Sequence, residues 1–273
     1  MNRIPMLLAA GAVLVLSGCS KQMSSVGGAP SVGTMRVMMT DAPGSFDAVN
    51  LVVEEVAALH ADTGTWEVLS SDPTTVDLLT LQNGTFMTLS SATVPSGAYS
   101  QIRLTLGEGS TVVVDGVSHP LTVPSGASSG LKLNGSFDVT NGGLFDVLID
   151  FDAARSIHRT HDGSYWMTPV VRILGANQSG AITGQVMPTG VPTDVFVVQG
   201  ADTVATTVCA TTGFFKATVL PAGSYAVHVV PQAGYVPRSL NPVTVSAGST
   251  TDLGAINLVQ VGVDETVNPQ REQ

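Results

Sequence analysis

The chain of 273 residues carries 21 acidic and 11 basic side chains, which gives it a net charge of −10 at pH 7. This acidity excludes nucleic acid and anionic lipid headgroups as partners held by charge. Charged residues make up only 12% of the chain, and 44% of its residues are hydrophobic. The composition, which is also rich in Val, Thr, Ser and Gly, is typical of a folded, β-rich extracellular protein.

The first residues predict export. Arg3 precedes an apolar run at residues 6–16 that is too short for a permanent membrane-spanning helix. The run ends in LSGC at residues 16–19, a motif that resembles the lipobox of bacterial lipoproteins. The resemblance implies removal of residues 1–18 as a signal peptide and acylation of Cys19, with palmitate for example. Because Ser20 rather than Asp follows, it also implies attachment through this lipid to the outer membrane, on its periplasmic or its cell-surface face.

Residues 19–33 are small and polar, which predicts a flexible tether before the first folded domain. Alternating apolar residues and turn signals then predict a series of strands. These are expected at 34–40, 49–60, 66–69, 98–107, 111–114, 117–119, 136–140, 144–150 and 165–174. The stretch at 49–60 also has helical spacing, but the turn signal at residues 62–65 favours a strand.

Local signals add detail to this first domain, residues 34–174. Asp115-Gly116 predicts a two-residue hairpin, and the NGG sequence at 141–143 predicts a second hairpin. Pro169 indicates an edge strand or a bulge. Short helical turns are expected at 77–82 and 153–157.

The segment 175–180 marks a domain boundary, because it is polar and contains two glycines. Beyond it, seven strand signals predict a small β-sandwich at residues 180–260, followed by a polar tail at 261–273. The signals lie at 181–187, 194–199, 203–209, 214–219, 224–230, 243–246 and 254–259. The predicted fold class is therefore all-β, with two consecutive Ig-like or prealbumin-like β-sandwich domains after the signal peptide and tether.

One turn occurs in both domains. VPSGAY at 94–99 matches LPAGSY at 220–225, and each precedes an alternating strand. In such a Pro-x-Gly turn, proline fixes one backbone dihedral and glycine supplies the positive one. We expect the tyrosine to pack at the mouth of the strand, and shared turn chemistry explains the match better than domain duplication.

Two stretches resemble known families. The motifs TDAPG at 40–44, FDAV at 46–49, the turn and strand at 94–104, DFDAARSI at 150–157 and PVVR at 169–172 resemble the bacterial lipoprotein family with domain of unknown function 4382, over about residues 35–174. That family supplies no catalytic residue to carry over, and His158 and His161 depart from its usual pattern.

The second stretch, residues 181–258, carries GQV at 184–186, TGFF at 212–215, LPAGSY at 220–225 and PQAGY at 231–235. These motifs resemble the carboxypeptidase-regulatory-like, prealbumin-like sandwiches. The same fold includes starch-binding-like modules, so the resemblance makes carbohydrate binding one expectation.

Candidate metal ligands gather around His158, His161 and Asp152, because two histidines three residues apart and a carboxylate suit a transition metal. A solvated loop between residues 157 and 165 explains them better. A calcium site is the second idea, built from Asp41, Asp47, Glu54, Glu55, Asp146, Asp150 and Asp152. Turn capping explains these carboxylates better, with Asp41 expected to cap its own turn.

One cysteine and two aromatic residues are further candidates for a functional site, but their sequence context supports such a role only weakly. Cys209 has no partner once Cys19 is acylated, and its alternating surroundings predict a buried apolar role rather than a catalytic thiol. Tyr165 and Trp166 are candidates for stacking a sugar ring, but adjacent residues on a strand face opposite sides, so only one can serve a given surface. Core packing is the favoured interpretation of Trp166.

Together these patterns predict a non-catalytic, lipid-anchored envelope lipoprotein without cofactors that acts as a binding or scaffolding module, with a glycan as one ligand class. The alternatives are a protein-interaction or assembly component of the envelope and, last, a metal-dependent hydrolase that uses residues 150–161. The chain lacks a phosphate loop and a Cys-x-x-Cys pair.

Overall fold

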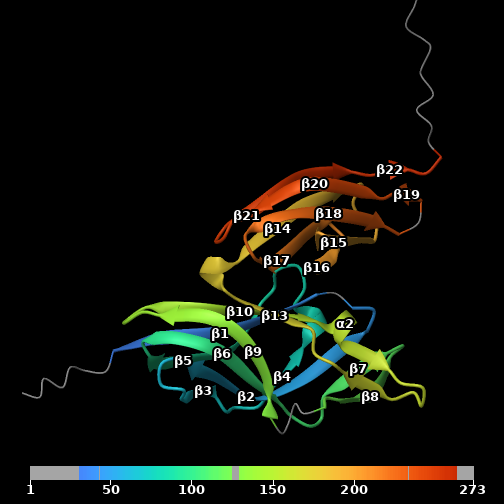
Figure 1. Ribbon diagram of the computed structural model, residues 1–273. Coiled ribbons are helices and arrows are strands. Elements are labelled where there is room, and N and C mark those ends of the chain that lie inside the picture. Colours follow the sequence, from blue (N-terminus) through green and yellow to red (C-terminus); the bar gives the residue numbers. More distant parts are fainter. Residues whose placement is uncertain (1–30, 43, 125–128, 233, 263–273) are drawn as a thin grey trace, which may run out of the picture. The chain divides into compact units, whose positions relative to one another are not determined.

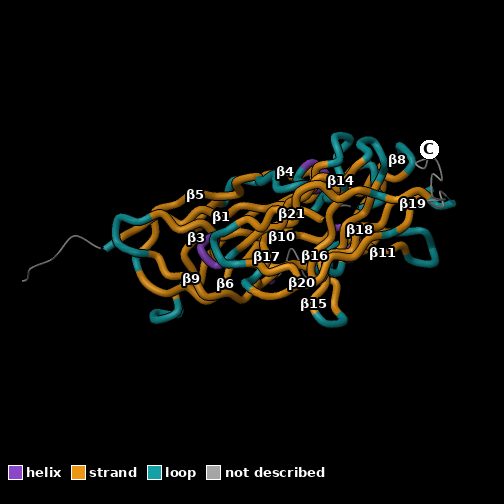
Figure 2. Tube along the Cα trace, turned by 90° about the horizontal axis from the view of Figure 1, so that it is seen from above, coloured by secondary structure: helices purple, strands orange, loops and turns teal. Residues whose placement is uncertain are grey.

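A computed structural model describes residues 31–42, 44–124, 129–232 and 234–262, and these residues form strands almost throughout (Figures 1 and 2). The predicted all-β fold is thereby confirmed. The signal peptide, Cys19, the tether as far as residue 30 and the tail from residue 263 lie outside the described residues. Within the described ranges, no helix has the length and apolar character needed to cross a membrane.

The first sandwich consists of two sheets. The smaller has the strand order β13-β10-β1-β5, and the larger has the order β11-β12-β8-β7-β2-β6-β9, with β3 and β4 also paired to β2. The strands are β1 (Val32–Ala42), β2 (Ala48–His60), β3 (Trp66–Ser70), β4 (Thr74–Asp77), β5 (Met87–Pro95), β6 (Gly97–Leu106), β7 (Thr111–Val114), β8 (Val117–Thr122), β9 (Leu131–Val139), β10 (Leu144–Asp152), β11 (Ile157–Arg159), β12 (Tyr165–Met167) and β13 (Val171–Gly175).

The second sandwich also consists of two sheets, with the orders β17-β14-β21 and β16-β15-β18-β20, and a two-stranded ribbon of β19 and β22 adjoins it. Its strands are β14 (Gly180–Met187), β15 (Thr193–Gln199), β16 (Asp202–Val208), β17 (Phe214–Leu220), β18 (Gly223–Pro231), β19 (Tyr235–Val236), β20 (Arg238–Val245), β21 (Thr250–Asn257) and β22 (Val259–Gln260). All seven strands expected here are present.

Each sandwich encloses its own apolar core. Side chains that alternate along the strands meet between the two sheets, as a half-buried antiparallel sheet requires. Phe137, Phe151 and Ile149 are fully buried in the first core, and Phe215 and Val227 in the second. The Phe137 ring also covers Gly135, where an added Cβ would lie 2.1 Å from the ring.

Short helical turns occur where they were expected. The 3-10 turn η1 (Leu78–Thr80) begins at Asp77, whose carboxylate accepts a hydrogen bond from the Leu79 N–H. The helix α2 (Ala153–Ser156) begins at Asp152, whose carboxylate accepts one from the Arg155 N–H at 2.9 Å. A second 3-10 turn, η2 (Ala176–Gln178), occupies the predicted boundary between the sandwiches.

Three local expectations are confirmed. The stretch at 49–60 is a strand, and β7 and β8 form the predicted hairpin, with positive φ angles at both Asp115 and Gly116. The two Pro-x-Gly turns place their tyrosines alike. Tyr99 donates to the Pro95 carbonyl at 2.8 Å and Tyr225 to the Pro221 carbonyl at 2.7 Å, and both rings are buried.

Two predictions are wrong. Residues 136–140 and 144–150 do not form a hairpin, because β9 pairs with β6 whereas β10 lies parallel to β1 in the other sheet. The glycines of the NGG turn instead form hydrogen bonds with the start of β1. Gly142 N donates to the Val32 carbonyl, and Thr34 N donates to the Gly143 carbonyl. The single strand at 165–174 is divided into β12 and β13 around Pro169, which has no N–H for a ladder bond.

Separate cores predict separate stabilities. We expect Phe137→Ala and Phe215→Ala each to lower the free energy of unfolding of its own sandwich by about 3–5 kcal/mol, because each removes a fully buried ring. Calorimetry should show the first change moving one transition and the second moving the other. The exposed Leu144→Ala serves as the control, and a single transition that both variants shift equally would contradict independent cores.

Candidate functional site

Strand β10 is buried on both faces along its second half. Its inner face packs into the first core, while its outer face, together with β1 and β13, contacts β16 and β17 of the second sandwich. Asp150 and Asp152 lie on the outer face, since residues two apart on a strand share a side. Two carboxylates are therefore buried where the two sandwiches meet.

Each of these carboxylates has an arginine. Asp150 is ion-paired with Arg172, its neighbour in register on β13, and Asp152 binds Arg155 at 2.7 Å. Arg155 also donates to the Thr203 carbonyl of β16 at 3.2 Å. Thus arginines balance the charges that the contact between the sandwiches covers.

Asp41 at the end of β1 is the third carboxylate of this cluster. It is 4% exposed, and its Oδ1 accepts the Ala153 N–H at 3.0 Å while Oδ2 has no hydrogen-bond partner. The expectation that Asp41 caps its own turn is met in part, because its carboxylate interacts with the backbone N–H of Ala42 in that turn as well as with that of Ala153 at the start of α2. Burial, reinforced by the charges of Asp150 and Asp152, raises the pKa of Asp41 to about 9.

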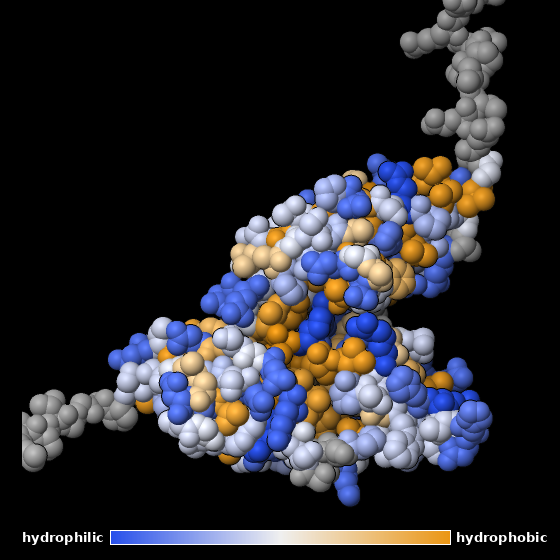
Figure 3. Space-filling view, viewed as in Figure 1, coloured by the Kyte–Doolittle hydropathy of each residue, from blue (hydrophilic) through white to orange (hydrophobic). Residues whose placement is uncertain are grey.

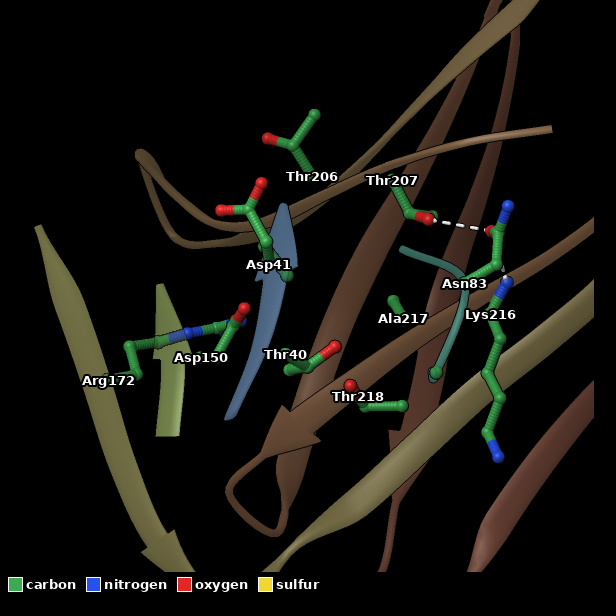
Figure 4. A pocket seen from close by; sticks show the side chains of 12 residues that line it. Thr40, Asp41, Asn83, Asp150, Arg172, Thr206, Thr207, Lys216, Ala217 and Thr218 are labelled. Carbon is green, nitrogen blue, oxygen red and sulfur yellow. Dashed lines mark hydrogen bonds and ion pairs between the residues drawn. The ribbon is translucent and has the colours of Figure 1, made fainter. Parts of the chain in front are cut away.

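A cavity of about 10 Å³ lies among these groups (Figure 4). This volume is enough for one water molecule. On its far side Asn83 joins the two sandwiches, because its Oδ1 accepts hydrogen bonds from Thr207 Oγ1 at 3.0 Å and from Lys216 N at 3.3 Å. The cluster therefore holds β16 and β17 against β1 and β10, and in this state it admits nothing larger than water.

Burial also raises the pKa of Asp150, and Arg172 opposes that rise. With Asp41 protonated and the other two carboxylates facing arginines, the cluster carries no net negative charge at neutral pH. A calcium site would need several ionised oxygens directed at one point. The other carboxylates of the calcium hypothesis lie apart from this cluster: Glu55 binds Arg103, Asp146 binds Arg36, Asp47 accepts the Gly116 N–H, and Glu54 lies over Gly107.

The candidate transition-metal ligands are not brought together. His158 lies on β11 and His161 in the turn that follows, both exposed, while Asp152 is buried against Arg155. Among the residues that the structure describes, no group of three His, Cys, Asp or Glu side chains is placed to hold a metal ion. Cys209 is half-buried beside the second core, and burial raises the pKa of its thiol to about 11.

Trp166 lies on the surface, so the expectation that it packs in a core is wrong. Its side chain is 45% exposed, whereas Tyr165 is buried with its ring 5.1 Å from that of His119. On β12, Trp166 pairs with His158 of β11 on one side and with Thr122 of β8 on the other. Residues in register on neighbouring strands share a face, so these three side chains form an exposed row.

A groove of about 460 Å³ adjoins this row, because Thr122 also lines it. Such a volume lies in the range of small-molecule sites. The groove includes Thr111, whose Oγ1 accepts a bond from Asn50 at 3.2 Å and keeps its own hydrogen to donate. Glu108 lines the groove, and Glu54 lies over Gly107 beside it, where an added Cβ would come within 2.4 Å of Glu54 Oε1.

Apolar side chains reach the surface at the β19–β22 ribbon (Figure 3). Val236 and Val259 are paired in register, and Val261 follows two residues later. All three are exposed, with Val261 at 67%. Sequence reasoning missed both the groove and this ribbon, since neither has a motif of its own.

The sequence profile described as "Domain of unknown function (DUF4382)" matches residues 32–169, which span the first sandwich up to β12. The chain belongs to this family. No curated protein matches the DUF4382 chain.

Some solved structures align over most of the chain. The TIE protein of Bacillus anthracis does so at 12% identity over 84% of this chain and 34% of its own, with a TM-score of 0.25. The chain thus spans about a third of the length of that protein. The minor pilin of Streptococcus agalactiae aligns at 11% identity over 85% and 99%, and the major pilin of Bacillus cereus at 8% over 84% and 70%, both with TM-scores of 0.25. Scores this low do not define a shared fold.

The buried Asp41 predicts a pH-dependent stability. Its pKa is raised from 3.8 to about 9 on folding, so the folded state binds the extra proton and the stabilisation is lost as pH rises towards 9. In urea titrations from pH 5 to 9, wild type should lose stability relative to Asp41→Asn by up to about 1.4 kcal/mol per pH unit, the limit for one proton.

Asp47→Asn is the matched control, because Asp47 also accepts a single backbone N–H but is exposed. Its stability curve should follow that of the wild type. Parallel curves for the wild type and Asp41→Asn would show that Asp41 does not take up a proton on folding.

Proposed function

We propose that this DUF4382 chain is a non-catalytic binding module of the bacterial envelope that binds a neutral glycan at the Trp166 face and its groove. The observation that carries the proposal is the exposed indole of Trp166, in register with Thr122 at the groove. An exposed indole provides an apolar face on which a sugar ring can stack. Trp166 lies next to a groove large enough for a ligand. This position favours a role in binding over the alternative that the tryptophan is exposed without a function.

The polar groups beside Trp166 fit the hydroxyls of a sugar. The Thr111 hydroxyl is able to donate, and the carboxylates of Glu54 and Glu108 are acceptors. Two carboxylates also disfavour uronic acids and other anionic glycans, as does the net charge of −10. A neutral oligosaccharide is therefore the preferred class.

Binding without turnover is part of the proposal. The described carboxylates of the buried cluster face arginines or a backbone N–H, and the water-sized cavity beside them leaves no room for a substrate. A hydrolase needs a general acid and base on either side of a bound substrate. The buried cluster is therefore not expected to turn over a glycan, and at the groove, where Glu54 and Glu108 lie, we expect the glycan to be released intact, which a product assay checks.

We expect Trp166→Ala to weaken binding of a neutral oligosaccharide at least about tenfold, or about 1.4 kcal/mol, through loss of stacking. A glycan array finds the ligand, and calorimetry with the purified chain measures the affinity. Trp166→Phe should keep most of it. Phe214→Ala is the matched control, because Phe214 is a partly exposed aromatic residue on β17 of the other sandwich. Unchanged affinity in Trp166→Ala, or an equal loss in Phe214→Ala, would refute this site.

A lipid anchor at Cys19 is the second part of the proposal, supported by the lipobox sequence at residues 16–19. Cys19→Ser should abolish acylation and release the protein from the outer-membrane fraction. Fractionation and labelling with a fatty-acid analogue measure both effects, with Cys209→Ser as the control that should remain acylated. A Cys19→Ser protein that stays in the membrane would show that another element holds it there.

A role in envelope assembly is the alternative, favoured by the exposed valines of the β19–β22 ribbon. Apolar side chains grouped at a surface are typical of protein contacts. If this role is the main one, Val259→Lys should abolish capture of a partner protein from native envelopes, while Trp166→Ala should leave it unchanged.

A further inference from the structure

A second cavity, of about 180 Å³, lies beside the segment that joins the two sandwiches. Strand β17 contributes Lys216 and Thr218 to it, the β20–β21 turn contributes Ser249, and the first residue of β21 is Thr250, which also lines it. It is separate from the Trp166 groove, with which it shares no lining residue. Its polar lining residues are therefore one lysine and several residues with hydroxyls, and Lys216 and Thr218 also line the small cavity beside Asp41.

The backbone holds this wall in place. Gly248 N donates to the Ser179 carbonyl at 2.8 Å, and Ala181 N donates to the Ser249 carbonyl at 2.9 Å. Gly180 makes the approach possible, because an added Cβ there would lie 2.6 Å from the Ser246 carbonyl oxygen. The hydroxyls are thus carried on a turn that is fixed against β14.

The charge in this cavity is uncompensated. Among its described lining residues there is no Asp or Glu, although the chain has 21 acidic residues. Within the described part of the chain, the Lys216 ammonium forms no ion pair, and Figure 4 shows it directed away from Asn83 and Asp41. The neighbouring buried carboxylates face arginines or, in Asp41, carry a proton, so they do not offset the lysine.

We propose that the Lys216 cavity binds a phosphate group, either as free inorganic phosphate or as the phosphomonoester of a larger molecule. An ammonium supplies a point charge and three donors to such an anion, and the hydroxyls of Thr218, Ser249 and Thr250 add further donors. The volume accommodates a phosphate and a few further atoms. Phe86 and Leu148 provide an apolar wall for the carbon skeleton of an ester.

The test uses two probes, inorganic phosphate and glycerol 3-phosphate, an ester without a sugar ring for the Trp166 face, with the chain as it is after signal-peptide removal. Calorimetry at constant ionic strength should give saturable binding of at least one probe. Tighter binding of the ester identifies the phosphomonoester as the source, and equal binding identifies the free anion. Either result supports the cavity, whereas no saturable binding of either probe overturns it.

Lys216→Met keeps the aliphatic stem over Gly84 and the backbone bond to Asn83, but removes the charge. It should weaken phosphate binding at least about tenfold while the urea unfolding curve stays close to that of the wild type. Lys132→Met is the matched control, because Lys132 lines a different cavity of about 170 Å³ and should leave binding unchanged. Equal binding by Lys216→Met and the wild type would refute the assignment.

Discussion

The arrangement of the described chain depends on strand β10 being buried on both sides. An outer face that carries Asp150 and Asp152 can be covered only if their charges are balanced, because an unpaired buried carboxylate costs several kcal/mol. Arg172 and Arg155 provide that balance, and Arg155 reaches β16 of the second sandwich as well. Removing one partner of such a pair would leave a buried charge uncompensated, which is strongly destabilising. On the other side of the junction, Asn83 of the first sandwich also links the two sandwiches, because it accepts hydrogen bonds from Thr207 and Lys216 of the second.

The positions of many strands and turns were predictable because they depend on residues that are close together in the sequence. Alternation along the second sandwich predicted the seven strands of its two sheets, and short helical turns were predicted at the two places where Asp77 and Asp152 cap them. The pairing of strands was not predictable in the same way. The NGG turn at 141–143 looks like a hairpin turn, but it leads from one sheet to the other, and only the parallel pairing of β10 with β1 reveals this. Turn residues describe how a chain bends, whereas long-range contacts decide which strands it joins.

In the candidate sites, too, local features were predictable from the sequence, whereas long-range contacts were not. The sequence singled out Trp166, and alternation correctly separated it from Tyr165, but the core was expected to hold the tryptophan rather than the tyrosine. Which face of a short strand is covered depends on neighbours far away in the chain, here Thr122 of β8. The Lys216 cavity was beyond sequence reasoning for a related reason, since its donors come from β17 and from a turn more than thirty residues later.

The position of β1 has a mechanical consequence. This strand of 11 residues follows the predicted anchor and spans about 36 Å at 3.3 Å per residue. It is paired along its length with β10 on one side and with β5 on the other, and its far end adjoins α2, which leads into β11 and the Trp166 face. If a bound polymer is pulled away from the membrane, the load runs along β1, so the hydrogen bonds on both of its sides are sheared together rather than opened one at a time. If the chain is anchored at Cys19 and binds a glycan as proposed, this geometry is suited to holding the ligand under tension.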